Sequence, residues 1–222
     1  MKLTNEQIEY VSNYIESKDI KWYELQVELT DHMVSSMEEF WEQNPDLSFE
    51  QVQENTFKKF TKPELKAIEK QRTKILGKEV RQAQYKLVDE YLKFPKIFVS
   101  LVLVFIAFKI SFHFDKPHKY LTLLLTSSIV FYVPIIYYGF KNKKIDSKRF
   151  LAIELGTPIF PMLLFPTLII NLVGQLKQEL LTYPLLVLLF CFLWMFGNLF
   201  LMTGLFLQKY TISNVKKQYQ LT

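Results

Sequence analysis

Four long apolar runs constrain the fold of this chain more than any other feature. They cover residues 95–114, 120–140, 150–173 and 183–207. A helix needs about 20 predominantly apolar residues to cross the hydrocarbon core of a bilayer. Runs of this length are too long for barrel strands, and lipid offers no partner to an unpaired backbone group. Residues 95–222 are therefore predicted to form a four-helix transmembrane bundle that ends in a short polar tail.

Charge divides the chain at nearly the same point. Residues 1–92 carry 13 Lys and Arg against 18 Asp and Glu, whereas residues 93–222 carry 14 against 4. The first 57 residues are the most acidic part, with 3 basic and 13 acidic side chains. The net charge of +5 and the mild hydropathy are therefore averages over a polar, acidic part and an apolar, basic part.

The distribution of Lys and Arg around the apolar runs predicts the orientation in the membrane. The loop at 141–149 holds five basic residues and the tail after 207 holds three, while the two opposite loops together hold three. Basic loops face the cytoplasm. Four spans then place both termini in the cytoplasm, in a multi-pass protein of the cell (inner, cytoplasmic) membrane. The N-terminus MKLTNEQIEY has no apolar signal-peptide core, so the first apolar run is expected to direct insertion.

Few polar groups interrupt the apolar runs, and these are the candidates for a role inside the membrane. Glu154 lies near the predicted cytoplasmic end of the third run, and Asn198 lies near the middle of the fourth. Pro158, Pro161 and Pro166 predict a kinked or broken third helix. Broken helices occur at transporter sites, but no deep carboxylate or inverted repeat accompanies this one. The proline-rich third run and Asn198 leave a small multi-span transporter or efflux component as the alternative function.

Two capping boxes predict where helices begin in the N-terminal part. LTNEQI places Thr4 at an N-cap with Gln7 at the third helical position, and LSFEQV repeats the pattern with Ser48 and Gln51. We expect helices at 4–17, 21–43 and 48–60, each with one apolar stripe. Three such helices can bury their stripes against each other, which predicts a small cytoplasmic three-helix head over residues 1–61.

The predicted helix at 21–43 carries an acidic face beside its apolar stripe. The stripe recurs at spacings of three and four and consists of Trp22, Leu25, Leu29, Met33, Ser36 and Phe40. The neighbouring face is the candidate interaction or switch surface and consists of Glu28, Asp31, His32, Ser35, Glu38 and Glu39.

Four roles are possible for His32 on this face. A zinc site would need a second His or Cys, and His113 and His118 are predicted on the other side of the membrane. A serine nucleophile would need an oxyanion pocket and a third group, which a small helical head does not offer. A pH switch is simpler, because Glu28 four residues away would favour charged His32. A boundary contact with Glu28 or a neighbouring helix is the simplest interpretation.

Residues 62–94 predict a basic, amphipathic stalk helix between the head and the membrane. Its lysines would be attracted to anionic headgroups, and Gly77 weakens its middle by about 1 kcal/mol relative to Ala. A plain solvated connector is the alternative interpretation of this segment. Direct nucleic-acid binding is not expected, because the attached acidic head would repel phosphate.

The order of these features resembles the HAAS-domain membrane proteins. The resemblance rests on YELQVELTDHMVSSMEEFW followed by NPDLSFEQVQENTFKKF and several hydrophobic spans. Its matching residues are Glu28, Leu29, Asp31, His32, Glu38, Glu39, Phe49 and Phe60. The chain departs from the family pattern at Lys62-Pro63, where relatives often have a glycine-containing turn. The resemblance implies a membrane-associated signalling module without assigned enzyme chemistry, often linked with PadR-type transcriptional regulators.

The sequence therefore predicts an all-α, non-enzymatic integral membrane protein. We expect the acidic head to bind a cytosolic protein, and the bundle to contact the lipid bilayer. No catalytic residue, cofactor or metal is predicted.

Overall fold

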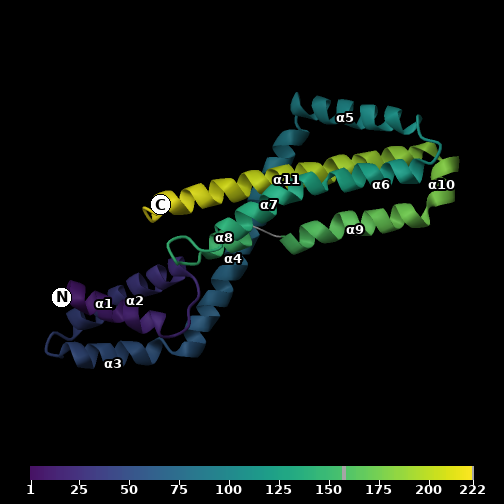
Figure 1. Cartoon of the computed structure of the whole chain (residues 1–222). Helices are drawn as coiled ribbons and strands as arrows, with labels where there is room; N and C mark the ends of the chain where they lie inside the picture. The colour runs from purple at the N-terminus through teal and green to yellow at the C-terminus, as the bar shows by residue number, and fades with distance from the viewer. Residues whose placement is uncertain (157–158, 222) are drawn as a thin grey trace. The chain divides into compact units, whose positions relative to one another are not determined.

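The structure is a computed structural model that describes residues 1–156 and 159–221, without the side chains of residues 159–163 and 165. Every regular element in this range is a helix, which confirms the all-α prediction for the described residues (Figure 1). The helices are α1 (Asn5–Glu16), α2 (Tyr23–Gln43), α3 (Phe49–Lys59), α4 (Lys62–Leu92), α5 (Lys96–Ser111), α6 (Pro117–Ser127), α7 (Ile129–Lys141), α8 (Leu151–Leu155), α9 (Ile159–Gln175), α10 (Lys177–Thr182) and α11 (Pro184–Gln218).

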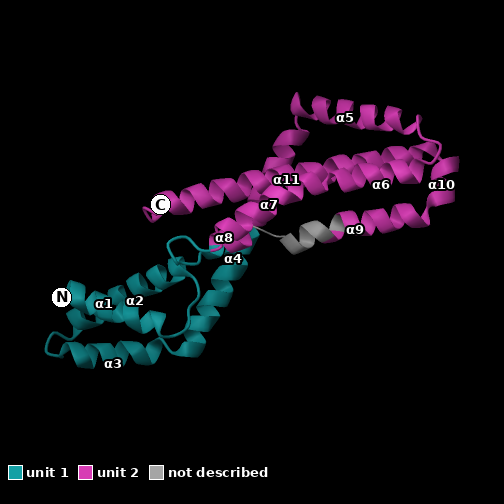
Figure 2. Cartoon of the chain, viewed as in Figure 1, with its two compact units in different colours: residues 1–78, 144–151, 222 teal, residues 79–143, 152–221 magenta. Residues whose placement is uncertain are grey.

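The chain divides into two compact units (Figure 2). Unit 1 contains residues 1–78 together with residues 144–151, and unit 2 contains residues 79–143 and 152–221. The division falls inside α4, between Lys78 and Glu79. The boundaries at 61 and 94 stay a prediction. The loop between the second and third apolar runs belongs to unit 1, although the chain on both sides of it belongs to unit 2.

The helices of unit 1 begin where the capping boxes predict. Thr4 and Ser48 are the N-caps of α1 and α3, and each hydroxyl accepts a hydrogen bond from the backbone N–H of the glutamine three residues later. The glutamine side chains Gln7 and Gln51 bond back to the cap backbone, which completes both boxes. Each cap contributes roughly 1 kcal/mol by pairing N–H groups that the helix itself cannot pair.

The core of unit 1 lies between α1, α2 and α3. Its fully buried side chains include Val11, Ile15, Leu25, Met33, Met37 and Val52. Burial of one such side chain is worth about 1.5–3 kcal/mol, so these residues drive the three helices together. The core stripe of α2 differs from the predicted one at its C-terminal end, because Met37 is buried while Ser36 and Phe40 are only half-buried.

Unit 2 is built around α11, which packs against α5, α6, α7, α9 and α10 (Figure 1). A continuous apolar core joins α11 to α5, α6 and α9, with Leu121, Val173, Phe190 and Cys191 almost fully buried. A smaller cluster of Tyr132, Ile135 and Leu201 joins α7 to the later part of α11.

Two helices in the described range are long and apolar enough to cross a membrane. One is the combined α6–α7 segment, Pro117–Lys141, and the other is α11. A third candidate exists if α4 and α5 count together, although they are bent by 77° at the break between them. In the first predicted run the structure has α5, which is only 16 residues long. In the third run it has the short α8 and the 17-residue α9. Four crossings therefore remain a prediction.

Candidate interaction site on the N-terminal unit

Residues 144–151, here called the hairpin loop, reverse the chain in a tight two-residue turn. Ile145 and Lys148 exchange both backbone hydrogen bonds, at 3.0 and 2.9 Å. Asp146 and Ser147 between them have positive φ angles of 48° and 66°. Two central residues with positive φ are typical of a type I′ hairpin turn, which usually contains Asn-Gly. A serine in this backbone region is strained by about 1 kcal/mol, so the surrounding contacts must hold the turn in place.

The hairpin loop packs on the first residues of α2. The backbone N–H of Tyr23 donates to the carbonyl oxygen of Arg149 at 2.9 Å, and the Tyr23 ring meets the Phe150 ring edge-on at 5.7 Å. Lys148 Nζ lies 3.7 Å from the centroid of the Tyr23 ring, and the Arg149 guanidinium lies 5.0 Å from that of Trp22. Two cation–π pairs, a ring contact and a backbone bond thus fix the loop to the helix start.

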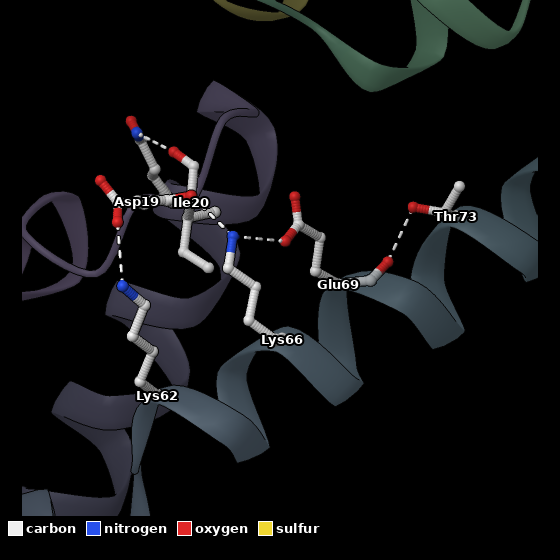
Figure 3. Close-up of polar contacts among 7 residues, drawn as sticks. Asp19, Ile20, Lys62, Lys66, Glu69 and Thr73 are labelled. Atoms are coloured by element: carbon white, nitrogen blue, oxygen red, sulfur yellow. Dashed lines mark hydrogen bonds and ion pairs between the residues drawn. The ribbon is translucent and has the colours of Figure 1, made fainter.

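The first turns of α4 are held to the end of α1 by an ion-pair network (Figure 3). Lys62 Nζ lies 2.9 Å from the carboxylate of Asp19, and Lys66 Nζ donates to the Asp19 carbonyl oxygen at 2.8 Å. Lys66 also pairs with Glu69 at 3.1 Å. The hydrogen bond from Lys62, and then its positive charge, hold the pKa of Asp19 below its usual value. The Lys62–Asp19 pair is solvent-exposed, so its role is to fix geometry more than to add stability.

Glu28 and His32 have separate partners on neighbouring elements. The Glu28 carboxylate pairs with Arg72 Nε of α4 at 3.3 Å. The His32 ring meets the Phe60 ring edge-on at 5.8 Å, and His32 is otherwise exposed. Within the described residues, His32 is therefore a boundary residue whose ring contact is with Phe60, and Glu28 pairs with the stalk helix.

The remaining residues of the predicted face fall into two groups. Glu38 is half-buried and accepts a hydrogen bond from the backbone N–H of Leu3 at 2.9 Å, so it ties the N-terminus to α2. Asp31, Ser35 and Glu39 are exposed. These three side chains leave an acidic, solvated strip along α2 that is not used in holding unit 1 together. In the described part of the chain, no three His, Cys, Asp or Glu side chains are grouped as metal ligands would be.

The polar residues predicted inside the membrane belong to unit 2. Glu154 in α8 is exposed, and Asn198 in α11 is buried, where its amide donates to the Trp194 carbonyl oxygen at 2.9 Å. Pro166 lies inside α9. Pro158 lies outside the described residues, and Pro161 falls in the first turn of α9 with its side chain outside the description.

Two features of the structure escaped the sequence prediction. The Gln208 amide of α11 donates to the Ile135 carbonyl oxygen of α7 at 3.2 Å and is fully buried. The hairpin loop packs on Trp22 and Tyr23. A sequence signal existed only for the first, since a glutamine beside an apolar run can bond across helices in a membrane.

Comparison of the chain with models of protein families, with curated proteins and with solved structures finds no match.

Proposed function

We propose that this protein is a non-enzymatic integral membrane protein whose N-terminal unit is a cytoplasmic protein-interaction and signalling head. The observation that carries the proposal is the hairpin loop. This loop connects two apolar segments of unit 2, yet it belongs to unit 1 and is fixed to Trp22 and Tyr23. The head is thus joined to the apolar part of the chain through α4 and also through the loop.

The loop contacts support the proposed orientation. A loop between two membrane-crossing segments can touch the head only if both lie on the same side of the bilayer. This loop is also the most basic loop of the chain, and basic loops face the cytoplasm. The loop contacts also give the proposed head a means of signalling. A partner that shifts α2 would pull directly on the connection between two membrane segments.

The exposed acidic strip of Asp31, Ser35 and Glu39 is the proposed partner surface. Its charge favours a cytosolic protein with a basic surface, because complementary charges steer association and select among partners. The resemblance to HAAS-domain proteins is consistent with this class of partner and suggests a PadR-type transcriptional regulator.

Site-specific photo-crosslinking in intact membranes tests the proposal. A crosslinking amino acid at Ser35 or Glu39 of the full chain should capture the same protein, and one at the exposed Ser12 of α1 should not. Asp31→Lys should abolish the capture, whereas Asp31→Asn should weaken it only in part. Capture that is equal at all three positions, or unaffected by Asp31→Lys, would contradict a specific acidic docking strip.

A transport function is the second candidate, and buried Asn198 within the apolar α11 supports it. Asn198→Ala and Pro166→Ala should then reduce efflux or resistance in cells that produce the protein at unchanged levels. Unchanged flux in both variants would remove this candidate.

A further inference from the structure

The C-terminal half of α4 crosses α11 at a definite level within unit 2. Gln84 Nε2 donates to the carbonyl oxygen of Phe200 at 3.1 Å, and the Tyr85 ring meets the Phe200 ring edge-on at 5.9 Å. Val88, one turn after Gln84, is buried. Helical periodicity places Glu79, Gln82, Lys86 and Asp89 on the opposite side, and all four are exposed. This segment is therefore amphipathic, with its polar side turned away from α11.

The direction of α4 differs sharply from that of the apolar helix that follows it. The helix axes of α4 and α5 are bent by 77° at the break between Leu92 and Lys96. The segment Lys96–Ser111 has no charged side chain between Lys96 and Lys109. If α5 runs close to the bilayer normal, α4 leaves it at an angle close to the plane of the bilayer. A stalk that projects away from the membrane would instead continue the direction of α5.

The level of the crossing matches the depth of an interfacial helix. Phe200 lies 16 residues beyond Pro184, or about 24 Å along α11 at 1.5 Å per residue. With a hydrocarbon core of about 30 Å that begins at Pro184, Phe200 lies roughly 6 Å inside the far boundary. Amphipathic helices that lie in the membrane plane bury their apolar side about 5–10 Å into the headgroup and acyl boundary. The charged side of α4 then reaches headgroups and water.

The last turns of α4 and the bend that leads into α5 carry exposed aromatic rings. Phe94 is 85% exposed and Phe98 is 63% exposed, and Tyr91 and Tyr85 are also exposed. Lys96 Nζ lies 4.8 Å from the Tyr91 ring centroid. Aromatic rings interleaved with lysines are typical of the membrane–water interface, where the rings enter the acyl boundary and the ammonium groups stay with the headgroups.

We propose that residues 79–98 form an interfacial anchor that lies in the headgroup and acyl boundary of the bilayer, with Tyr85 and Phe94 inserted toward the acyl chains. The inference rests on the proposed membrane insertion of α5 and α11. Over residues 79–98 it replaces a free stalk with a segment whose depth is set by the lipid.

Depth measurements on single cysteines test the anchor. Cys191 is the only cysteine and is fully buried, so Cys191→Ala gives a background for one spin label at a time in the full chain. The labels replace Tyr85, Phe94, Gln82 and Leu103, in liposomes of phosphatidylcholine and phosphatidylglycerol. Leu103 is an exposed residue at the middle of α5 and serves as the deep reference, and Gln82 is the matched control on the polar side of α4.

For each label, the measured quantity is its accessibility to oxygen divided by its accessibility to a water-soluble nickel reagent. We expect this ratio to be several-fold higher at positions 85 and 94 than at position 82. Position 103 should be deeper still. Ratios at 85 and 94 equal to that at 82, with 103 deep, would overturn the anchor but leave membrane insertion intact. A ratio at position 103 that is typical of a water-exposed label would overturn both the anchor and the membrane insertion of α5. If Cys191→Ala fails to fold, the same labels in the wild-type background serve instead, because the buried thiol of Cys191 is not accessible to the labelling reagent.

Discussion

Lys148 Nζ lies 3.7 Å from the centroid of the Tyr23 ring, although the two residues are separated in sequence by the whole of α3 to α7. The next residue, Arg149, accepts the backbone hydrogen bond of Tyr23 and places its guanidinium near Trp22. These contacts attach the loop between two apolar segments to the start of a water-exposed helix. They are the basis of the proposed coupling between head and membrane.

Tyr23→Ala should release the hairpin loop. The substitution removes the cation–π pair with Lys148 and the ring contact with Phe150, which together are worth about 2 kcal/mol. Hydrogen exchange measured by mass spectrometry on the full chain in detergent should therefore become roughly 30-fold faster across residues 144–151. Tyr10→Ala removes aromatic contacts elsewhere in unit 1 and is the control. Equal acceleration in both variants would mean that the loop responds only to general loss of stability.

Ser147→Gly should stabilise the same loop. Ser147 has a φ of 66°, which glycine adopts without the steric cost that serine carries. The gain is about 1 kcal/mol, so exchange of the backbone N–H groups of Ile145 and Lys148 should slow by roughly fivefold. Ser147→Ala keeps the strained backbone and should not slow exchange. A stabilised alanine variant would show that loss of the hydroxyl, and not relief of the backbone, is responsible.

Asp19→Asn should remove one source of acid sensitivity in unit 1. The pKa of Asp19 is lowered by Lys62, so this group stabilises the fold above the ordinary carboxyl pKa of about 4 and loses that contribution as pH falls through the lowered value. Asparagine tolerates the positive φ of 59° at this position. The difference in Tm between wild type and variant should be positive near pH 6 and should shrink as the pH falls below about 4 toward the lowered pKa of Asp19.

Asp46→Asn is the matched control for this experiment. Asp46 is exposed and has no ion pair among the described residues, so its replacement should leave the acid dependence of Tm unchanged. A constant difference between wild type and Asp19→Asn at every pH would contradict the assigned role of the Lys62 pair.

Gly77→Ala should stiffen α4 at the division between the two units. A Cβ atom at Gly77 meets no atom within 4 Å, and α4 is continuous through this residue. Alanine should stabilise the helix by about 0.5–1 kcal/mol and slow hydrogen exchange in residues 70–85. Gly174→Ala in α9 has equal space and should leave this segment unchanged. Unaltered exchange in Gly77→Ala would indicate that α4 does not open locally at this point.

Local signals in the sequence were sufficient for most of unit 1. The capping boxes at Thr4 and Ser48 determine two helix starts from neighbouring residues alone, and the spacing of Leu25, Leu29 and Met33 determines the buried side of α2. Contacts between distant parts of the chain left no such signal. The sequence indicates only an orientation signal at Lys148 and Arg149, because nothing in KNKKIDSKR predicts contacts with the aromatic rings of Tyr23 and Trp22, 125 and 127 residues earlier.

The apolar runs were identified correctly as helical, but their limits were not. Composition does not show that α5 ends at Ser111 or that α11 continues for 35 residues to Gln218, because these limits depend on packing and on helix breaks. Only the tertiary contacts show which residues of the candidate face have partners within unit 1. Glu28 pairs with Arg72 and Glu38 accepts a hydrogen bond from Leu3, while Asp31, Ser35 and Glu39 are exposed. Helical periodicity alone does not distinguish these two groups.

Because residues 144–151 belong to unit 1, this unit cannot complete its fold until the ribosome has made residue 151. During synthesis the ribosome completes residue 78 well before residue 151, and at about 5–20 residues per second the gap of 73 residues lasts roughly 4–15 s. In that interval Trp22 and Tyr23 lack the hairpin loop that packs on them. Unit 1 is therefore completed only after residues 96–141 have been made, and under the proposed topology this means only after the segments at 96–141 have entered the membrane.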